Sequence, residues 1–342
     1  MRPPDTIRLL LLVSWRERGQ WSLLRHLRQA GHVVTVRGPW FPDGPPGLTR
    51  LSVWFSRFYL PLWALLHAGK YDVIASWNLP YATVFGLLKR LLGFLHLPLH
   101  LARDFHIDPG RAMHPGYAVK LRLLGAALPG IDLALTTSRA ECAIYAARFG
   151  LPKERFRFFP DAPPSELFAV PAMPVAEHVF AYGNSDRDFD TFLAAAARLD
   201  VPVTLLSQAY IPRTPPSPNV TLLRDYVSRQ ELVRLIATAR CCVVPLRDFR
   251  VAAGQNAMFE VMALGRPLVI ADNIAVAEYV SSGRDALTYP PGNAVALAER
   301  IRILLDDSGA AEALGQWARQ SSQVWHARQM ELFSKLLLEV MA

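Results

Sequence analysis

The feature that most constrains the fold of this chain is a regular alternation of short apolar runs with longer amphipathic segments. The runs of the first half are rich in leucine, valine, isoleucine and phenylalanine. They span residues 7–15, 33–38, 71–77, 99–105, 131–138 and 156–160. Strands that alternate with helices predict parallel sheets built from βαβ units. Because the runs are almost continuously apolar, we expect helices to cover both faces of the sheet.

A second series of apolar runs follows a proline-rich stretch at residues 160–178. These runs span residues 178–183, 201–208, 219–225, 241–246 and 266–272. A proline-rich segment without periodicity is typical of a linker, and 342 residues exceed what one hydrophobic core usually holds. The sequence therefore predicts two doubly wound α/β domains. One comprises residues 1–165 with a C-terminal helix over about residues 318–342, and the other comprises residues 176–317.

Positive charge is concentrated in the first half of the chain. Residues 1–170 contain 21 Lys and Arg against 11 Asp and Glu, a balance of +10, whereas residues 171–342 have a balance of −2. This asymmetry suggests that the first half faces an anionic partner such as a phospholipid surface, a phosphorylated lipid or nucleic acid. A merely solvated basic surface is the alternative. Nucleic acid is disfavoured because the basic residues form no base-reading motif.

Several features bear on the compartment. Residues 7–15 are too short to span a bilayer and lead into charged residues, so we expect no signal peptide. Lys89, Arg90 and Pro98 interrupt the apolar stretch 84–102, which disfavours a spanning helix and leaves an interfacial one as the alternative. The three cysteines form no disulfide framework. We predict a cytoplasmic protein, with a peripheral position on the inner face of the membrane as an alternative, because residues 49–70 mix aromatic and basic side chains.

The most informative local pattern lies at residues 251–272. Gly254 comes directly before a helical run, and a helix that begins after a glycine can bind a phosphate through its free N–H groups and its dipole. Glu260 lies four residues after Asn256, one turn further along. An ionised carboxylate there suits a pair of sugar hydroxyls, since it accepts two hydrogen bonds at once. The alternative is a helix acid that pairs with an arginine.

The stretch from residue 259 to residue 307 resembles the donor-binding half of GT-B glycosyltransferases of the family-4 type. The family's Met-Ala-x-Gly-x-Pro-x-Val pattern follows Glu260, and Glu278, Gly283 and a Tyr-Pro-Pro-Gly-Asn turn fall in family order. The resemblance implies a GT-B fold, in which two Rossmann-like domains face a central cleft. It also implies a retaining, metal-independent, hexosyltransferase-like enzyme. One position departs from the pattern, because Ala252 stands where the family usually has its first glutamate.

The resemblance also implies a donor site in the second half. Residues 178–199 are similar to the family's first strand, loop and helix, which places Arg187 at the family's lysine and Asn184 at its arginine. Arg187 would neutralise the leaving diphosphate; the alternative is a loop cation that pairs with Asp186 or Asp188. Gln255 and backbone amides would contact the donor sugar and the diphosphate. The implied donor-binding residues are Gly183, Asn184, Arg187, Gly254, Gln255, Asn256 and Glu260.

On the acceptor side, residues 14–36 resemble the glycine loop and first helix of the acceptor domain, where Gly19 and Gln20 would line the cleft. His106 and Asp104 follow the fourth apolar run, where related enzymes carry a cleft histidine. His106 would orient the acceptor hydroxyl or the donor sugar, and Asp104 would serve as a base. The alternatives are a structural histidine and a salt bridge between Asp104 and Arg103.

These inferences predict a glycosyltransferase that moves a sugar from a UDP- or GDP-type donor to a lipid-linked or cell-envelope glycan acceptor. We expect no cofactor, no essential metal and no nucleic-acid partner. Two alternatives remain open. A non-catalytic GT-B subunit that binds a partner is compatible with Ala252, and a nucleotide-sugar 2-epimerase is disfavoured by the scarcity of candidate carboxylates.

Overall fold

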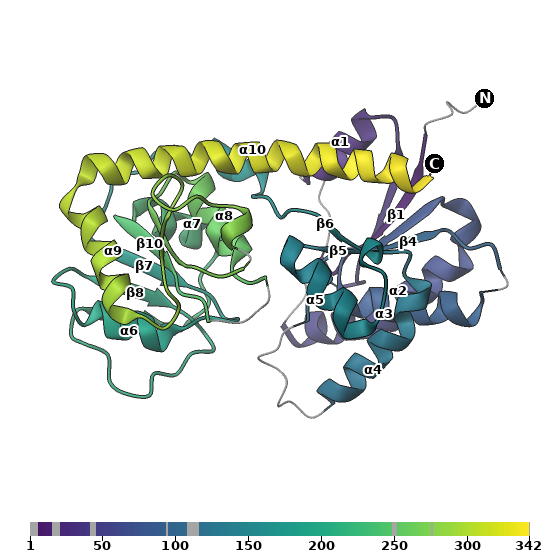
Figure 1. Ribbon diagram of the computed structural model, residues 1–342, viewed down its shortest axis with the longest axis horizontal. Coiled ribbons are helices and arrows are strands. Elements are labelled where there is room, and N and C mark those ends of the chain that lie inside the picture. The colour runs from purple at the N-terminus through teal and green to yellow at the C-terminus, as the bar shows by residue number, and fades with distance from the viewer. Residues whose placement is uncertain are drawn as a thin grey trace. The chain divides into compact units, whose positions relative to one another are not determined.

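The computed structural model describes most of the chain, and its fold is two compact α/β units. The described residues are 6–15, 21–41, 46–93, 95–107, 116–247, 252–274 and 276–341. Unit 1 comprises Met1–Pro160 with Gln329–Ala342, and unit 2 comprises Asp161–Arg328. Each unit contains one six-stranded sheet with helices packed around it (Figure 1).

Unit 1 contains a parallel sheet in the order β2-β1-β3-β4-β5-β6. Its strands are β1 (Arg8–Leu12), β2 (Val33–Arg37), β3 (Val73–Ser76), β4 (Leu99–Ala102), β5 (Leu133–Thr136) and β6 (Phe156–Phe158). Its helices are α1 (Ser22–Gln29), α2 (Pro46–Leu66), α3 (Leu79–Leu91), α4 (Tyr117–Ala127) and α5 (Arg139–Phe149). All six strands fall inside the apolar runs that predicted them.

The interior strand β1 shows why this sheet is covered on both sides. Successive side chains of a strand point to opposite faces. Leu9 and Leu11 are buried in a cluster with α1, whereas Leu10 and Leu12 are buried in another with α2 and α3. A run of four leucines is therefore the expected sequence for a strand without a solvent face.

Unit 2 repeats the plan with a parallel sheet in the order β12-β11-β10-β7-β8-β9. Its strands are β7 (Val179–Tyr182), β8 (Val203–Leu206), β9 (Val220–Leu223), β10 (Cys241–Val244), β11 (Leu268–Ala271) and β12 (Leu287–Tyr289). Its helices are α6 (Phe189–Ala196), α7 (Arg229–Thr238), α8 (Gln255–Ala263) and α9 (Ala294–Asp306). Helix α6 packs against α9, and α7 packs against α8. The sequence predictions did not include β12.

Most helices that follow a strand begin with a side-chain cap. Asn78, Ser138, Asp188, Ser228 and Asn293 each accept a hydrogen bond from a backbone N–H in the first turn of α3, α5, α6, α7 and α9. Helix α8 begins instead at Gly254, which has no side chain to offer. The first N–H groups of α8 therefore depend on the backbone, on solvent or on a ligand.

The long C-terminal helix α10 (Ser308–Met341, yellow in Figure 1) contributes to both units. Its first part belongs to unit 2, where Arg319 donates to Ala263 O and Trp325 Nε1 donates to Tyr279 O. From Gln329 onward it belongs to unit 1, where Phe333 and Leu337 join the core beside β1. The division within the helix thus lies at residue 329, and not near residue 318, because the polar contacts before it tie the helix to unit 2.

The proline-rich segment is packed against unit 2 instead of forming a free linker. It contains a 3-10 turn at Ser165–Ala169, in which Leu167 is fully buried. Phe168 O accepts a hydrogen bond from Arg319, and His326 Nδ1 contacts Pro163 O at 2.9 Å. Unit 2 consequently begins at Asp161, ahead of the expected residue 176.

The stretch at residues 84–102 comprises the last turns of α3 and the strand β4, so it is not one interfacial helix. Over the part of the chain that the structure describes, every helix is too short or too polar to traverse a bilayer.

Candidate active site

The N-terminus of α8 lies just beyond the carboxyl end of β10, where ligands bind in open α/β sheets. Gly254 has a φ of +86°, and a Cβ at this position would come within 2.7 Å of Leu246 Cδ2. Only glycine fits this turn without strain. Gln255 is 7% exposed, and its Nε2 has no hydrogen-bond partner among the described residues, whereas Asn256 is exposed.

The loop after β7 holds Arg187 over a second special glycine. Gly183 has a φ of +136°, and a Cβ there would meet Arg187 Nε at 2.7 Å. Arg187 Nε donates to Tyr182 O at 3.3 Å, and its Nη1 donates to Ser185 O at 2.9 Å. Burial lowers the pKa of Arg187 from its usual value, but an arginine remains charged in this setting.

Backbone pairing joins this loop to the segment that precedes α8. Arg187 forms an antiparallel bridge with Leu246, and Asp188 N donates to Pro245 O at 2.9 Å. The Leu246 side chain in turn occupies the space that a Cβ on Gly254 would need. The structure therefore brings Arg187 and the start of α8 to the same edge of the sheet. Asn184 lies in the same loop, where its Oδ1 accepts from Ser207 Oγ and from Gln208 N.

Glu260 is held by two side chains that the sequence predictions did not include. Tyr182 donates its hydroxyl to Glu260 Oε2, and Arg229 Nη1 lies 2.5 Å from Glu260 Oε1. Burial and the adjacent carboxylate raise the pKa of Tyr182 well above its usual value, so Tyr182 remains a neutral donor. The pairing with an arginine, foreseen as the alternative for Glu260, is thus present. A carboxylate has about four acceptor positions, so this pairing leaves capacity for further donors.

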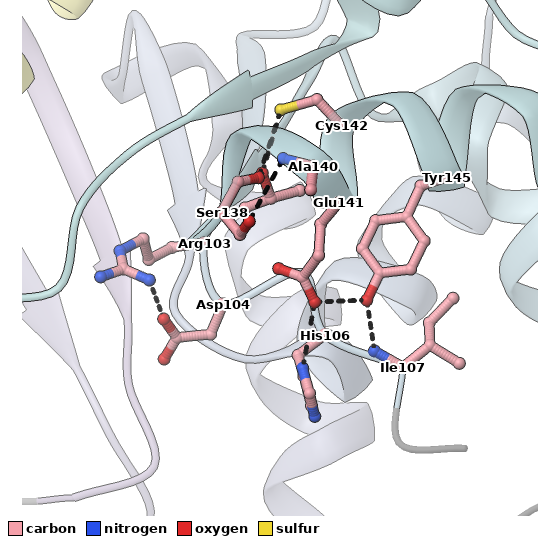
Figure 2. A network of polar contacts seen from close by, with 10 residues as sticks. Arg103, Asp104, His106, Ile107, Ser138, Ala140, Glu141, Cys142 and Tyr145 are labelled. Atoms are coloured by element: carbon pink, nitrogen blue, oxygen red, sulfur yellow. Dashed lines mark hydrogen bonds and ion pairs between the residues drawn. The ribbon is translucent and has the colours of Figure 1, made fainter. Parts of the chain in front are cut away.

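Two predicted residues of unit 1, Asp104 and His106, follow β4 (Figure 2). Asp104 adopts a φ of +53°, and its carboxylate pairs with Arg103. Arg103 is almost fully buried, and its guanidinium lies over the rings of Trp77 and Phe159. The salt bridge foreseen as the alternative for Asp104 is therefore present, and a role as a base remains a prediction.

His106 belongs to a group of residues that we call the His106 cluster, which consists of His106, Ile107, Glu141 and Tyr145. His106 Nδ1 lies 3.5 Å from Glu141 Oε1, and the Tyr145 hydroxyl donates to the same oxygen at 2.9 Å. The Ile107 N–H donates to the Tyr145 oxygen at 3.1 Å. Figure 2 shows these groups converging on Glu141, at the first turn of α5. Burial and Glu141 raise the pKa of Tyr145 far above its usual range, so this hydroxyl also remains neutral.

Four residues whose side chains make these contacts were absent from the sequence predictions, namely Tyr182, Arg229, Glu141 and Tyr145. Tyr182 could have been found because it directly precedes Gly183. Glu141 could have been found because it stands three residues after Ser138, which is the capping-box spacing. Arg229 and Tyr145 carry no local signature, because their partners are distant in sequence. Gly19 and Gln20, predicted for the acceptor cleft, lie outside the described residues.

Comparison with known proteins now bears on unit 2. Residues 185–307 match the family described as Glycosyl transferases group 1. Unit 2 contains a glycosyl transferases group 1 domain. The matched range includes Arg187, the start of α8 and Glu260. No curated protein sequence matches the chain.

Solved structures extend the likeness to the whole fold. Sucrose-phosphate synthase from Thermosynechococcus elongatus aligns over 98% of this chain and 99% of its own, with a TM-score of 0.69 and 18% identity. HepE from Anabaena, solved in complex with UDP-glucose, aligns over 98% of this chain and 100% of its own, with a TM-score of 0.68 and 15% identity. An alpha,alpha-trehalose-phosphate synthase from Burkholderia vietnamiensis aligns over 98% of both chains, with a TM-score of 0.65 and 12% identity. The fold is GT-B, and with its group 1 domain the protein is a glycosyltransferase.

Proposed function

We propose that this protein transfers a hexose from a UDP-sugar to an acceptor hydroxyl with retention and without a metal ion. The observation that carries the proposal is the Gln255 amide, which is buried at the start of α8 with an Nε2 that meets no acceptor among the described residues. A buried donor without an acceptor is costly unless a ligand supplies one. UDP is favoured as the nucleotide because HepE has been solved with UDP and with UDP-glucose.

The proposed chemistry on the donor side is stabilisation of a departing diphosphate. The first N–H groups of α8 and the guanidinium of Arg187 form the positive end of the site, and both lie at one edge of the sheet. Arg187 then supplies the positive charge that a metal ion supplies elsewhere, so added chelator should leave the rate unchanged. Glu260 would take the ribose hydroxyls on the acceptor positions that Tyr182 and Arg229 leave available.

Nucleotide binding gives the first test. A ligand at 100 times its dissociation constant should stabilise the protein by about 2.7 kcal/mol, so thermal unfolding is measured with UDP, GDP, UDP-glucose and GDP-mannose. We expect UDP and UDP-glucose to stabilise the wild type and to do so less in Gln255→Leu. The matched control is Gln29→Leu on the exposed side of α1, which should behave as wild type.

Turnover gives the second test. Release of UDP with a candidate acceptor, followed by NMR of the product, reports both transfer and the configuration at the sugar. An inverted product contradicts retention, and loss of activity with chelator contradicts metal independence. Stabilisation by UDP without turnover on any acceptor favours the non-catalytic subunit, whereas no stabilisation by any nucleotide refutes the donor site.

We propose further that the acceptor is lipid-linked and is met at an anionic bilayer surface. Helix α2 exposes a row of large apolar side chains spaced by three or four residues, the spacing of one helix face. These side chains are Leu48, Leu51, Trp54, Phe55, Phe58, Leu62 and Leu66. Arg50 and Arg57 are exposed on the same helix. Apolar side chains beside basic ones are typical of helices that lie in a membrane interface.

Vesicle sedimentation tests this surface. We expect the protein to sediment with phosphatidylglycerol vesicles and not with phosphatidylcholine vesicles, and the Trp54→Ser, Phe58→Ser double variant to remain in the supernatant. Ile211→Ser, which removes an even more exposed apolar side chain from unit 2, is the control and should sediment like wild type. Sedimentation of the double variant at the wild-type level would contradict the proposal.

A further inference from the structure

The His106 cluster contains a carboxylate with almost no solvent exposure that faces a partly exposed histidine. The Glu141 side chain is 1% exposed, whereas the His106 side chain is 32% exposed. Burying an ionised carboxylate is costly unless hydrogen bonds and opposite charge compensate for the lost water. The contacts of Glu141 therefore indicate which function keeps a carboxylate buried at this position.

Part of the compensation is local to α5. Ser138 caps this helix and Glu141 stands three residues later, which is the capping-box spacing, and a carboxylate in the first turn also complements the helix dipole. These effects would account for a glutamate or a glutamine at this position. They do not account for the approach of His106, which comes from the segment after β4, to 3.5 Å from Glu141 Oε1.

The Tyr145 hydroxyl fixes the direction of that carboxylate oxygen. It donates to Glu141 Oε1 at 2.9 Å while accepting from the Ile107 N–H at 3.1 Å, so it links the glutamate to the residue next to His106. Tyr145 is itself almost fully buried. The oxygen that faces His106 Nδ1 is thus held by a neutral donor that cannot compete for a proton.

We propose that Glu141 is a positioning residue for His106: its carboxylate accepts the Nδ1–H and so holds the imidazole in the tautomer whose Nε2 carries the lone pair. The ring nitrogen that bears the proton is set by the hydrogen bond made at the other nitrogen. In Figure 2 the second ring nitrogen of His106 points away from Glu141. Nε2 then accepts a hydrogen bond from a sugar or acceptor hydroxyl, a step that rests on the proposed transferase function.

The test reads the tautomer directly. The protein is labelled with ¹⁵N-histidine, the His106 signals are assigned with His106→Gln, and the Nδ1 and Nε2 shifts are recorded well above the measured titration midpoint of the ring. We expect the wild type to show a protonated Nδ1. Glu141→Gln keeps a residue that suits the capping box but removes the charge, and should move the population toward a protonated Nε2. Unchanged shifts in Glu141→Gln would overturn the proposal.

A matched variant distinguishes the positioning of His106 by the Glu141 charge from a general loss of order in the cluster. Tyr145→Phe disturbs the same cluster and leaves the Ile107 N–H without its acceptor, but it keeps the Glu141 charge. We expect it to retain a protonated Nδ1 on His106. If Tyr145→Phe and Glu141→Gln shift the population equally, the effect is a general loss of order and the proposal fails. Should Glu141→Gln not fold, Glu141→Asp withdraws the carboxylate by one methylene and should give a smaller shift in the same direction.

Kinetics then tests the role in turnover. Glu141→Gln should lower kcat by about 10-fold with little change in KM for the donor, as expected for the loss of alignment of an acid–base group. Adding Glu141→Gln to His106→Gln should cost nothing further, because residues that act as one unit are not additive. An undiminished kcat in Glu141→Gln would contradict the positioning role. If the wild type shows no turnover, the transferase proposal fails while the tautomer result still decides the geometry.

Discussion

Each unit of this protein contains a glutamate that accepts a hydrogen bond from a buried tyrosine, but the two carboxylates are held differently. In unit 2, Glu260 takes the Tyr182 hydroxyl on one oxygen and the half-exposed Arg229 on the other. In unit 1, Glu141 has no solvent exposure, and one oxygen faces both the Tyr145 hydroxyl and His106.

The difference shows that a glutamate paired with a tyrosine can have two different roles. Glu260 keeps a small exposed area and has a permanently charged partner in Arg229, so its carboxylate stays paired whatever else binds. Glu141 relies on a neutral hydroxyl and on a histidine, whose charge and tautomer can change. A carboxylate of the first kind suits a fixed ligand contact, and one of the second kind suits control of a neighbouring proton.

The largest expected difference between the two clusters concerns Tyr145. Its replacement by phenylalanine removes the acceptor of the buried Ile107 N–H as well as the donor to Glu141. An unsatisfied buried group costs about 1–3 kcal/mol. Native-state hydrogen exchange should show correspondingly weaker protection of the Ile107 amide in Tyr145→Phe. Wild-type protection at Ile107 would mean that this N–H does not depend on the hydroxyl.

Alkaline pH should show how the burial of Tyr182 in unit 2 affects the free energy of unfolding. The pKa of Tyr182 is raised in the folded state, so the stability from its neutral form is complete below the unfolded pKa of about 10 and is lost as pH rises above it. The loss should approach about 1.4 kcal/mol per pH unit for this tyrosine. Urea unfolding between pH 9 and about 11 should therefore show a shallower decline in Tyr182→Phe, whereas Tyr226→Phe, at an exposed position, should decline as wild type does.

At neutral pH, Tyr182→Phe should destabilise the protein less than Tyr145→Phe does. The Tyr182 hydroxyl donates to Glu260 and weakly to Ala257 O, and Arg229 keeps Glu260 paired when it is lost. A typical hydrogen bond contributes about 1 kcal/mol. Urea unfolding of both variants under one set of conditions checks the order, and a reversed order would remove the contrast drawn between the clusters.

The smallest expected change in stability is that of Arg229→Ala. The arginine is half-exposed, and exposed ion pairs contribute roughly 0–1 kcal/mol. The thermal midpoint should hardly move and should lose part of its dependence on salt. Affinity for UDP is the sharper readout, because Glu260 without Arg229 is less firmly oriented. A large loss of stability would show that Glu260 depends on Arg229 as strongly as a buried carboxylate depends on its partners.

Local sequence patterns predicted most of the fold but few of the side-chain contacts around Glu260 and Glu141. Runs such as Leu9–Leu12 mark strands covered on both faces, and Gly254 followed by a helical run marks the start of α8. The three-residue strand β12 is followed at once by Pro290 and Pro291 and was missed, whereas the equally short β6 lies in a run with three phenylalanines. Contacts such as Tyr182 with Glu260 join residues 78 positions apart, and only the parallel order of the sheet brings them together.

The chain passes from unit 1 to unit 2 after Pro160 and returns at Gln329, and these two residues are joined by a hydrogen bond from Gln329 Nε2 to Pro160 O. Unit 2 is thus an insertion whose two ends meet. The core of unit 1 nevertheless needs the end of α10, because Met330, Phe333, Leu336 and Leu337 belong to the cluster around β1. The first 160 residues therefore cannot complete their core until the chain has passed through all of unit 2 and returned.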